Sequence, residues 1–213
     1  METKKVLPVL FLVMFLVMVG FGIIIPVIPF LAEKVGGSPT ELGLLMAVYS
    51  FMQLFFAPIW GRISDRVGRK PVMAIGIAGL AVSFFIMALA DSLWGLFVAR
   101  IVGGVLSSAN MPTAMAYVAD ITKPEDRGKG MGIVGAATGL GFIFGPAIGG
   151  IFSKTSLNLP FYIAGISSMI TLLLVMCLLK ESLQSRRELL DLKVNSLDGV
   201  ALKALLVTCS SCK

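Results

Sequence analysis

The sequence contains no histidine and only three cysteines among its 213 residues. Without imidazole there can be no histidine base and no histidine metal ligand, which excludes these classes of site. Cys177 lies in an apolar run, whereas Cys209 and Cys212 lie near the C-terminus, so no disulfide framework of the secreted kind is expected. The Cys209-x-x-Cys212 spacing has no second pair to complete a metal or redox site. We therefore expect neither a metal site nor a cofactor.

Charge is also scarce, because charged residues make up 14% of the chain and hydrophobic residues 57%. With a mean hydropathy of +0.94, this composition is typical of a protein embedded in a lipid bilayer. The net charge of +6 does not indicate nucleic-acid binding, because the cations form short clusters between apolar runs. The sequence has no Ser-His pair, metal cluster or phosphate loop, so we do not expect an enzyme.

Six apolar runs are long enough to cross a bilayer as helices, which requires about 20 residues each. They are Val6–Leu31, Leu42–Trp60, Pro71–Ala90, Leu93–Val118, Met131–Phe152 and Leu159–Leu179. The runs lack the alternation of barrel strands and exceed such strands in length, which predicts an all-α integral membrane fold. The first run has no small-residue cleavage site at its end, so it is interpreted as a retained helix and not as a signal peptide.

Lysine and arginine are distributed unevenly over the segments between the runs. The N-terminus and the second and fourth connections hold nine of them, whereas the other three connections hold only Lys34 and Lys154. Because short basic segments stay in the cytoplasm, both termini are predicted to be cytoplasmic. Residues 1–181 are assigned to a six-helix domain and residues 182–213 to a cytoplasmic linker or tail.

The second connection, from residue 61 to residue 70, is predicted to be a loop with a single carboxylate, Asp65, among four cations. Gly68 can adopt the positive backbone angle that a tight turn needs. Asp65 can pair with an arginine or with a helix N-terminus, so the segment is either a conformational switch or an ordinary basic anchor. A shorter copy of the pattern, Asp126-Arg127-Gly128-Lys129, precedes the fifth run and suggests two three-helix repeats.

In full, the second connection reads Gly61-x-x-x-Asp65-Arg66-x-Gly68-Arg69-Lys70. This pattern resembles a signature of the major facilitator superfamily. From residue 6 to residue 181 the chain resembles the N-terminal half of the bacterial drug:proton antiporters in that family. The resemblance implies a cytoplasmic latch in which Asp65 and Arg69 pair with Asp120 and with a helix of the other half.

Two further patterns extend the resemblance. The fifth run contains Gly141-x-x-x-Gly145-Pro146-x-x-Gly149-Gly150, which is similar to the antiporter motif of the family and implies export. Close packing of a neighbouring helix would also explain these glycines. The fourth run contains Leu96-x-x-x-Arg100-x-x-Gly103-Gly104, which is similar to a motif whose arginine is implicated in proton coupling. Gly103 stands where that motif usually has a polar residue.

Gln53 and Phe142 fall where related exporters place substrate contacts. Together with other polar, aromatic and methionine residues they could line a pocket for large apolar or cationic compounds, and these residues are Phe51, Asn110, Met111, Met115 and Phe144. Packing or lipid contact is the alternative for each aromatic or methionine side chain taken singly.

The predicted function is efflux of drug-like or other small amphiphilic compounds across a bacterial cell membrane by proton antiport. The lipid bilayer, the small-molecule substrate and protons are the expected partners. Arg100 is the only ionisable residue within the six runs, and a guanidinium stays protonated, so the proton-binding carboxylate is expected elsewhere. Three hypotheses remain open: a truncated transporter that needs a missing C-terminal half, a half-size transporter that works as a dimer, and a non-transporting membrane partner of another transporter.

Overall fold

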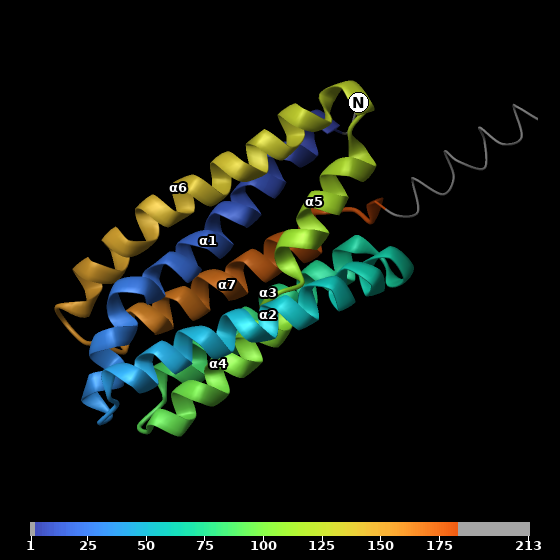
Figure 1. Ribbon diagram of the computed structural model, residues 1–213. Helices are drawn as coiled ribbons and strands as arrows, with labels where there is room; N and C mark the ends of the chain where they lie inside the picture. Colours follow the sequence, from blue (N-terminus) through green and yellow to red (C-terminus); the bar gives the residue numbers. More distant parts are fainter. Residues whose placement is uncertain (1–2, 183–213) are drawn as a thin grey trace, which may run out of the picture.

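The computed structural model describes residues 3–182, and within this range it contains helices and no strands (Figure 1). The helices are α1 (Thr3–Lys34), α2 (Pro39–Val67), α3 (Arg69–Ala88), α4 (Leu93–Ser107), α5 (Asn110–Ile121), the short 3-10 helix η1 (Pro124–Asp126), α6 (Arg127–Ser153) and α7 (Leu159–Leu178). They form six segments long and apolar enough to span a membrane, which confirms the predicted fold class. The predicted tail and Cys209 and Cys212 lie outside the described residues.

The predicted loop from residue 61 to residue 70 is almost entirely helical, which corrects the sequence interpretation. α2 continues to Val67, and α3 begins at Arg69, so Gly68 is the single residue between them. Gly68 has a φ of +125°, a region that side chains other than glycine rarely adopt. The charges of this segment are therefore held on two rigid helix ends and not on a flexible connection.

The fourth predicted helix is interrupted, and Ser108 and Ala109 separate α4 from α5. Pro112 has no N–H to donate to the carbonyl of Ser108, and its ring crowds that carbonyl, which explains a break at this position. The carbonyl of Val105, freed by the break, accepts a hydrogen bond from Trp60 Nε1 at 2.7 Å and one from Ser108 Oγ at 2.7 Å. A side chain of α2 thus stabilises the interruption in the fourth span.

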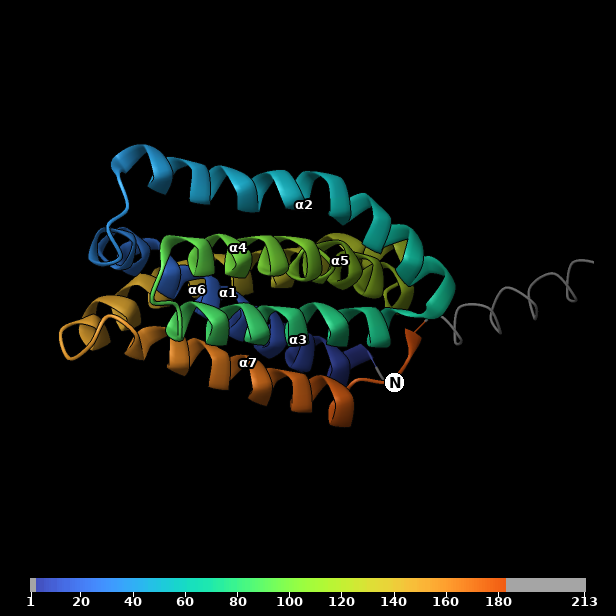
Figure 2. The same ribbon diagram turned by 90° about the horizontal axis from the view of Figure 1, so that it is seen from below.

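The helices pack in a bundle in which α1 lies against α6 and α7, while α3 lies against α4 and α7. Figure 2 shows α2 along one side of this bundle, where it contacts mainly α4. The core between the helices holds large, fully buried side chains, including Leu10, Met14, Phe84 and Phe161. Apolar side chains on the outside of a membrane helix meet lipid or another helix, so exposure of such residues is expected here.

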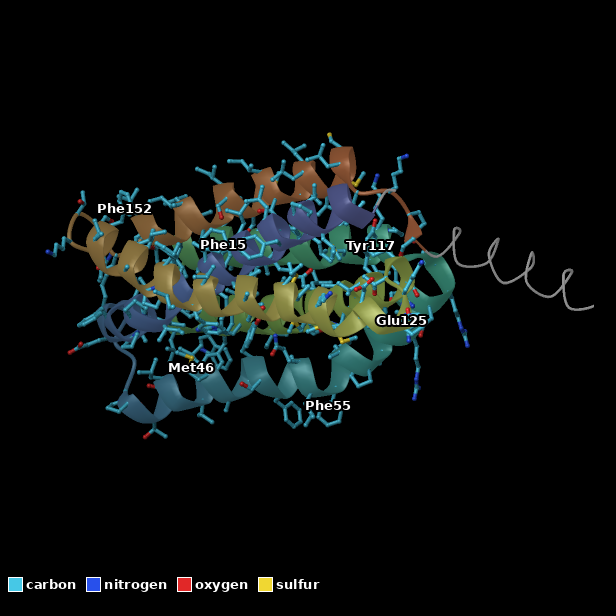
Figure 3. All side chains as sticks on the ribbon, turned by 90° about the horizontal axis from the view of Figure 1, so that it is seen from above. Phe15, Met46, Phe55, Tyr117, Glu125 and Phe152 are labelled. Carbon is cyan, nitrogen blue, oxygen red and sulfur yellow. The ribbon has the colours of Figure 1, made fainter. Side chains whose placement is uncertain are left out.

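α2 and α6 carry broad apolar faces that no other described helix covers. On α2, Phe51, Leu54 and Phe55 are each more than half exposed, and Phe55 points away from the bundle (Figure 3). On α6, Ile143 is 68% exposed and Ile151 is 63% exposed. These two helices therefore have room for lipid or for further helices along their whole length.

The beginning of α1, the α2–α3 junction, the segment between α5 and α6 and the end of α7 all lie at one end of the bundle (Figures 1 and 2). These are the segments that contain most of the lysines and arginines between the predicted runs. Grouping of the basic segments at one end agrees with the expected topology. That this end faces the cytoplasm remains a prediction, and it is called the basic end below.

Candidate functional site

Arg69, the first residue of α3, is the buried centre of an ion cluster at the basic end. Its Nη2 lies 2.6 Å from Asp65 Oδ1 of α2, and its Nε lies 3.0 Å from Asp120 Oδ2 of α5. Its Nη1 also donates to Ser64 Oγ at 2.7 Å. These four residues, Ser64, Asp65, Arg69 and Asp120, are called the latch cluster. The structure thus brings together the three charged residues that the family resemblance placed in a latch.

The two carboxylates of the latch cluster differ sharply in their surroundings. The side chain of Asp120 is 1% exposed and that of Arg69 is 4% exposed, whereas the side chain of Asp65 is 62% exposed. Ion pairs that lie open to solvent contribute little stability, and a buried charge that loses its partner is costly. Asp120 is therefore the main structural partner of Arg69, while Asp65 presents an accessible carboxylate beside it.

Glu181 completes the α2–α3 junction from the far end of the chain, and sequence reasoning missed it. Its carboxylate accepts hydrogen bonds from the backbone N–H groups of Arg69, at 2.8 Å, and Lys70, at 3.1 Å. A Cβ placed on Gly68 would lie 2.6 Å from Glu181 Oε2. No local pattern around Glu181 signals this contact, because it depends on how α7 packs against α3.

The remaining signature residues have separate positions. Lys70 Nζ donates to the carbonyl of Met176 on α7 at 2.7 Å. The carbonyl of Gly61 accepts from Ser64 Oγ at 2.8 Å, and no atom lies within 4 Å of a Cβ placed on Gly61. The side chain of Arg66 is exposed. The geometry thus gives Gly68 and Arg69 tight contacts and leaves Gly61 and Arg66 open.

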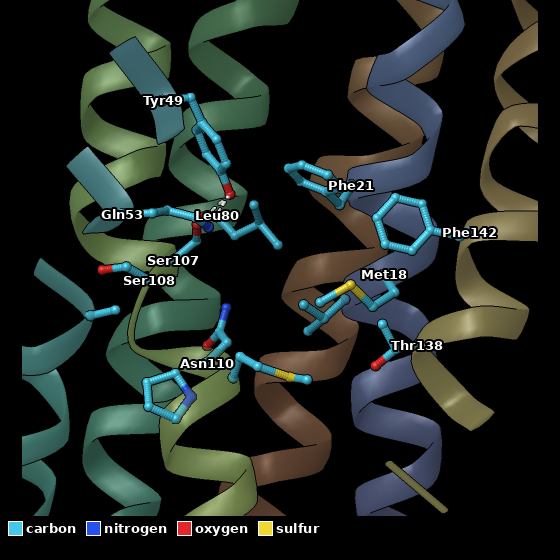
Figure 4. A pocket seen from close by; sticks show the side chains of 14 residues that line it. Met18, Phe21, Tyr49, Gln53, Leu80, Ser107, Ser108, Asn110, Thr138 and Phe142 are labelled. Carbon is cyan, nitrogen blue, oxygen red and sulfur yellow. Dashed lines mark hydrogen bonds between the residues drawn. The ribbon is translucent and has the colours of Figure 1, made fainter. Parts of the chain in front are cut away.

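A pocket of about 290 Å³ lies between α1, α2, the α4–α5 break and α6 (Figure 4). Apolar residues dominate its lining, and Met18, Phe21, Leu80 and Phe142 are among them. Gln53 and Phe142, the two predicted substrate contacts, lie on opposite walls of this pocket. A mostly apolar pocket with a few polar groups is the usual form of a small-molecule site.

A short polar chain runs along the α2 wall of the pocket. Gln53 Nε2 donates to Tyr49 Oη at 3.0 Å, and Tyr49 Oη lies at hydrogen-bonding distance, 2.9 Å, from Ser107 Oγ. The rings of Tyr49 and Phe21 have centroids 5.5 Å apart, and Phe21 makes an edge contact with Phe142 at 5.8 Å. Sequence reasoning missed Tyr49 and Ser107, because a tyrosine and a serine in an apolar run carry no distinctive pattern.

The other residues expected to line a pocket divide into two groups. Met111 and Asn110 do line it, and Asn110 is 3% exposed with neither of its amide atoms hydrogen-bonded. The ring of Phe51 lies tilted against that of Phe55, and Phe144 makes an edge contact with Phe15. These two phenylalanines lie outside the pocket lining. Met115 is likewise absent from the lining and packs against the core.

Arg100 is buried to 2% exposure in α4, so it does not reach the membrane surface. Its guanidinium carbon lies 5.3 Å from the centre of the Tyr49 ring, and Nη2 lies 3.5 Å from the sulfur of Met46. Nε of Arg100 has no hydrogen-bond partner, and among residues 3–182 no carboxylate pairs with this guanidinium. A cation on an aromatic face is attracted to it, but this contact replaces only part of a hydration shell.

Three glycines of the predicted antiporter motif form the contact between α6 and α1. A Cβ on Gly145 would lie 2.6 Å from the Cα of Gly22, and one on Gly149 would lie 2.7 Å from the carbonyl oxygen of Ile23. A Cβ on Gly141 would collide with the side chain of Met18. Gly150, by contrast, has no atom within 4 Å of its Cβ position, so this motif glycine faces open space. α6 continues through Pro146 as one helix.

Comparison with known proteins agrees with these features. A sequence model of the Major Facilitator Superfamily matches residues 10–206. The chain belongs to the major facilitator superfamily. It is 39% identical over 180 residues to the class D tetracycline resistance protein of Salmonella ordonez, covering 83% of this chain and 45% of that protein. It is 35% identical over 182 residues to multidrug resistance protein 1 of Bacillus subtilis, covering 85% of this chain and 47% of that protein.

The crystal structure of a human organic anion transporter, TETRAN, superimposes on this facilitator chain with a TM-score of 0.75 and 28% identity. The superposition covers 84% of this chain and 48% of that one. The facilitator chain thus spans less than half the length of the curated relatives that it matches. The chain is thus a multi-pass membrane chain of this superfamily, and the solved structure that it resembles is named a transporter.

Proposed function

We propose that this facilitator chain forms one half of an exporter that moves small amphiphilic compounds out of the cell in exchange for protons. The pocket between α1, α2, the α4–α5 break and α6 carries the proposal, because it combines apolar walls with a few polar groups. The proposal is supported by relatives whose names record resistance to tetracycline and to multiple drugs. Methionine and aromatic surfaces adapt to ligands of different shape, which suits a broad substrate range.

The pocket walls have different chemical roles in this proposal. Phe21 and Phe142 offer aromatic faces and edges to apolar or cationic parts of a substrate. Gln53 and Ser107, joined through Tyr49, offer hydrogen bonds to its polar groups. The compound that fits is therefore a flat or compact amphiphile with at least one hydrogen-bonding edge.

Alternating access requires a part of the protein that can adopt two arrangements. In this proposal the latch cluster is that part. Arg69 connects α2, α3 and α5 at the basic end, and the exposed carboxylate of Asp65 can exchange Arg69 for another partner. A helix N-terminus of the second half is such a partner, since a carboxylate is stabilised there. The latch closes the cytoplasmic side when the two halves meet and opens when they separate.

Coupling to protons needs a group that can release one, and the centre of the described spans contains no carboxylate for this. Arg100 cannot release its proton at any accessible pH. We assign Arg100 the role of a fixed positive charge that responds to a carboxylate on the second half. Its unpaired Nε and its position over Tyr49, within one side chain of the pocket, support this role.

The second half would cover the apolar faces of α2 and α6, where Phe51, Leu54 and Ile143 are exposed. Either a complementary six-helix unit or a second copy of this chain could supply that cover. Cross-linking in membranes distinguishes the two, because a second copy gives a cross-linked dimer when this chain is expressed alone. We propose the complementary unit, as the relatives are about twice as long.

The pocket is tested by measuring binding of a fluorescent cationic dye to the chain in lipid nanodiscs. Phe142→Ala should weaken binding about twofold to tenfold, because a lost aromatic contact costs about 0.5–1.5 kcal/mol. Gln53→Ala should weaken it for dyes that carry a hydrogen-bonding group. Phe152→Ala is the matched control, since Phe152 lies on the same helix outside the pocket lining. Equal binding by all variants would remove the pocket from the proposal.

A further inference from the structure

The first turn of α3 carries backbone N–H groups for which α3 itself has no acceptor, as at the start of any α-helix. The Glu181 carboxylate accepts two of them, from Arg69 at 2.8 Å and from Lys70 at 3.1 Å. Glu181 follows the end of α7 by a few residues, so it comes from the far end of the described chain. A carboxylate at a helix N-terminus is also favoured by the helix dipole. The end of the sixth span is thus hydrogen-bonded to the start of the third. These two hydrogen bonds, from the N–H groups of Arg69 and Lys70 to Glu181, are called the tie below.

Gly68 makes this tie possible. Its φ of +125° is a conformation that side chains rarely permit, and a Cβ at this position would lie 2.6 Å from Glu181 Oε2. The carboxylate of Glu181 therefore occupies the space that any side chain at position 68 would need. Gly68 and the carboxylate of Glu181 are therefore sterically complementary, and they are called the fitted pair below.

The residues around the end of α7 contact two of the three helices that hold the latch ions, namely α3 and α5. Ser182 Oγ lies 3.4 Å from Asp120 Oδ2, and the hydroxyl of Tyr117 on α5 donates to the carbonyl of Lys180 at 2.6 Å. On the other side, Lys70 of α3 donates to the carbonyl of Met176 at 2.7 Å. The end of α7 is therefore bonded to α3 and α5, between which Arg69 and Asp120 make their ion pair.

We propose that Glu181 is a positioning residue of the latch. It holds the first turn of α3 so that the Arg69 side chain faces Asp65 and Asp120, and it transmits movement at the end of α7 to this cluster. Its importance for transport rests on the proposed function, but the tie itself can be tested without any transport. Glu181→Gln keeps the size of the side chain, removes its charge and turns one acceptor oxygen into an NH₂ group, which faces a backbone donor.

Amide hydrogen exchange of the 213-residue chain in lipid nanodiscs measures the tie directly. The amides of Arg69 and Lys70 have Glu181 as their acceptor, and Pro71 has no amide, so a peptide covering this turn reports on Glu181. Glu181→Gln should accelerate exchange there by about tenfold or more, because hydrogen bonds to a charged group are the strong ones. Glu125→Gln is the matched control, since Glu125 is an exposed carboxylate at the same end (Figure 3).

Two results would overturn the proposal. One is unchanged exchange at Arg69 and Lys70 in Glu181→Gln. The other is a uniform increase through α4 and the core, which would show general destabilisation and no local tie. Gly68→Ala should produce the same local acceleration, and the Gly68→Ala/Glu181→Gln double variant should add little to either single change. Additive accelerations would show that Gly68 and Glu181 act independently and would contradict the fitted pair.

The transport consequence has its own readout once a complementary half is joined to the chain. Glu181→Gln should lower the maximal transport rate and leave the half-saturating substrate concentration unchanged, because the latch does not touch the pocket. Glu125→Gln should change neither quantity. A change in the half-saturating concentration alone would contradict a positioning role at the latch. Absence of transport in the unsubstituted protein would count against the proposed function, and the exchange measurement would still decide the role of Glu181.

Discussion

The unequal burial of Asp65 and Asp120 leads to a prediction about which carboxylate holds Arg69 in place. Both residues pair with the same guanidinium, at 2.6 Å for Asp65 and 3.0 Å for Asp120. Distance alone would make Asp65 the stronger partner. The Asp65 side chain, however, is 62% exposed, whereas the Asp120 side chain is 1% exposed. We therefore expect Asp120→Asn to destabilise the bundle more than Asp65→Asn.

The size of the difference follows from the surroundings of each carboxylate. An exposed ion pair contributes about 0–1 kcal/mol, so Asp65→Asn should cost no more than this. A hydrogen bond to a buried charged group contributes about 1.5–3 kcal/mol, and Asp120→Asn should cost that amount. The full penalty of an unpaired buried charge is not reached, because Asp65 and Ser64 still contact Arg69. The two variants should therefore differ by about 0.5–3 kcal/mol, which is about twofold to a hundredfold in their unfolding equilibrium constants.

Reversible unfolding of the chain in mixed micelles, titrated with a denaturing detergent, measures this difference. Tryptophan fluorescence is a suitable signal, because Trp60 is hydrogen-bonded at the α4–α5 break and loses this contact on unfolding. Asp126→Asn is the control, since within residues 3–182 the ion pair of Asp126 is an exposed contact with Lys129 at 3.6 Å. An Asp65→Asn cost equal to or above that of Asp120→Asn would refute the reasoning from burial. In a complete two-half protein, Asp65→Asn should leave insertion intact and abolish transport.

Two further predictions concern the antiporter motif and the buried arginine. Gly145→Val should destabilise the bundle by about 1–3 kcal/mol or more, since a side chain there meets the backbone of Gly22, whereas Gly150→Ala should be neutral or slightly stabilising. The same detergent titration checks both, and equal effects would contradict the assigned α1–α6 contact. Arg100→Met should stabilise the bundle by about 1 kcal/mol or more, because it removes a buried charge that no described carboxylate neutralises, while proton-coupled transport should be lost. Lower stability of Arg100→Met would show that Tyr49 and Met46 compensate the charge fully.

The spans were predictable because lipid leaves the backbone few alternatives. A long apolar run must form a helix to satisfy its own N–H and C=O groups, so hydropathy locates six spans without knowledge of their packing. Hydropathy locates helix ends less well. α2 extends beyond Trp60 to Val67. Its last turns are polar and lie at the end of the bundle, so hydropathy does not report that they are helical.

The break in the fourth span shows where a hydropathy reading fails. Asn110 and Pro112 lie inside the fourth predicted run, but a proline inside a membrane helix does not always break it. The carbonyl freed at Val105 is satisfied partly by Ser108 and partly by Trp60, a residue of another helix. Such a partner is visible only once α2 and α4 are packed together.

The candidate site was predictable to the extent that it follows a recurring pattern. The family resemblance of residues 61–70 implied that Asp65 and Arg69 pair with Asp120, and the structure brings these three residues together. The resemblance gave no indication of Glu181, which lies more than a hundred residues further along the chain. The antiporter motif likewise did not distinguish Gly145, in contact with α1, from Gly150, which faces open space. Contacts between distant segments decide these roles, and one sequence does not report them.

The most direct test of the account is proton-linked transport in everted membrane vesicles. Respiration sets up a pH gradient, a pH-sensitive dye reports it, and a cationic drug or tetracycline is added as the candidate substrate. The drug should dissipate the gradient when the chain is joined to a complementary six-helix half. The chain alone, and the joined protein with Asp65→Asn, should give no response. Drug-dependent proton release by the chain alone would contradict the two-half account, and no release by the joined protein would contradict proton antiport.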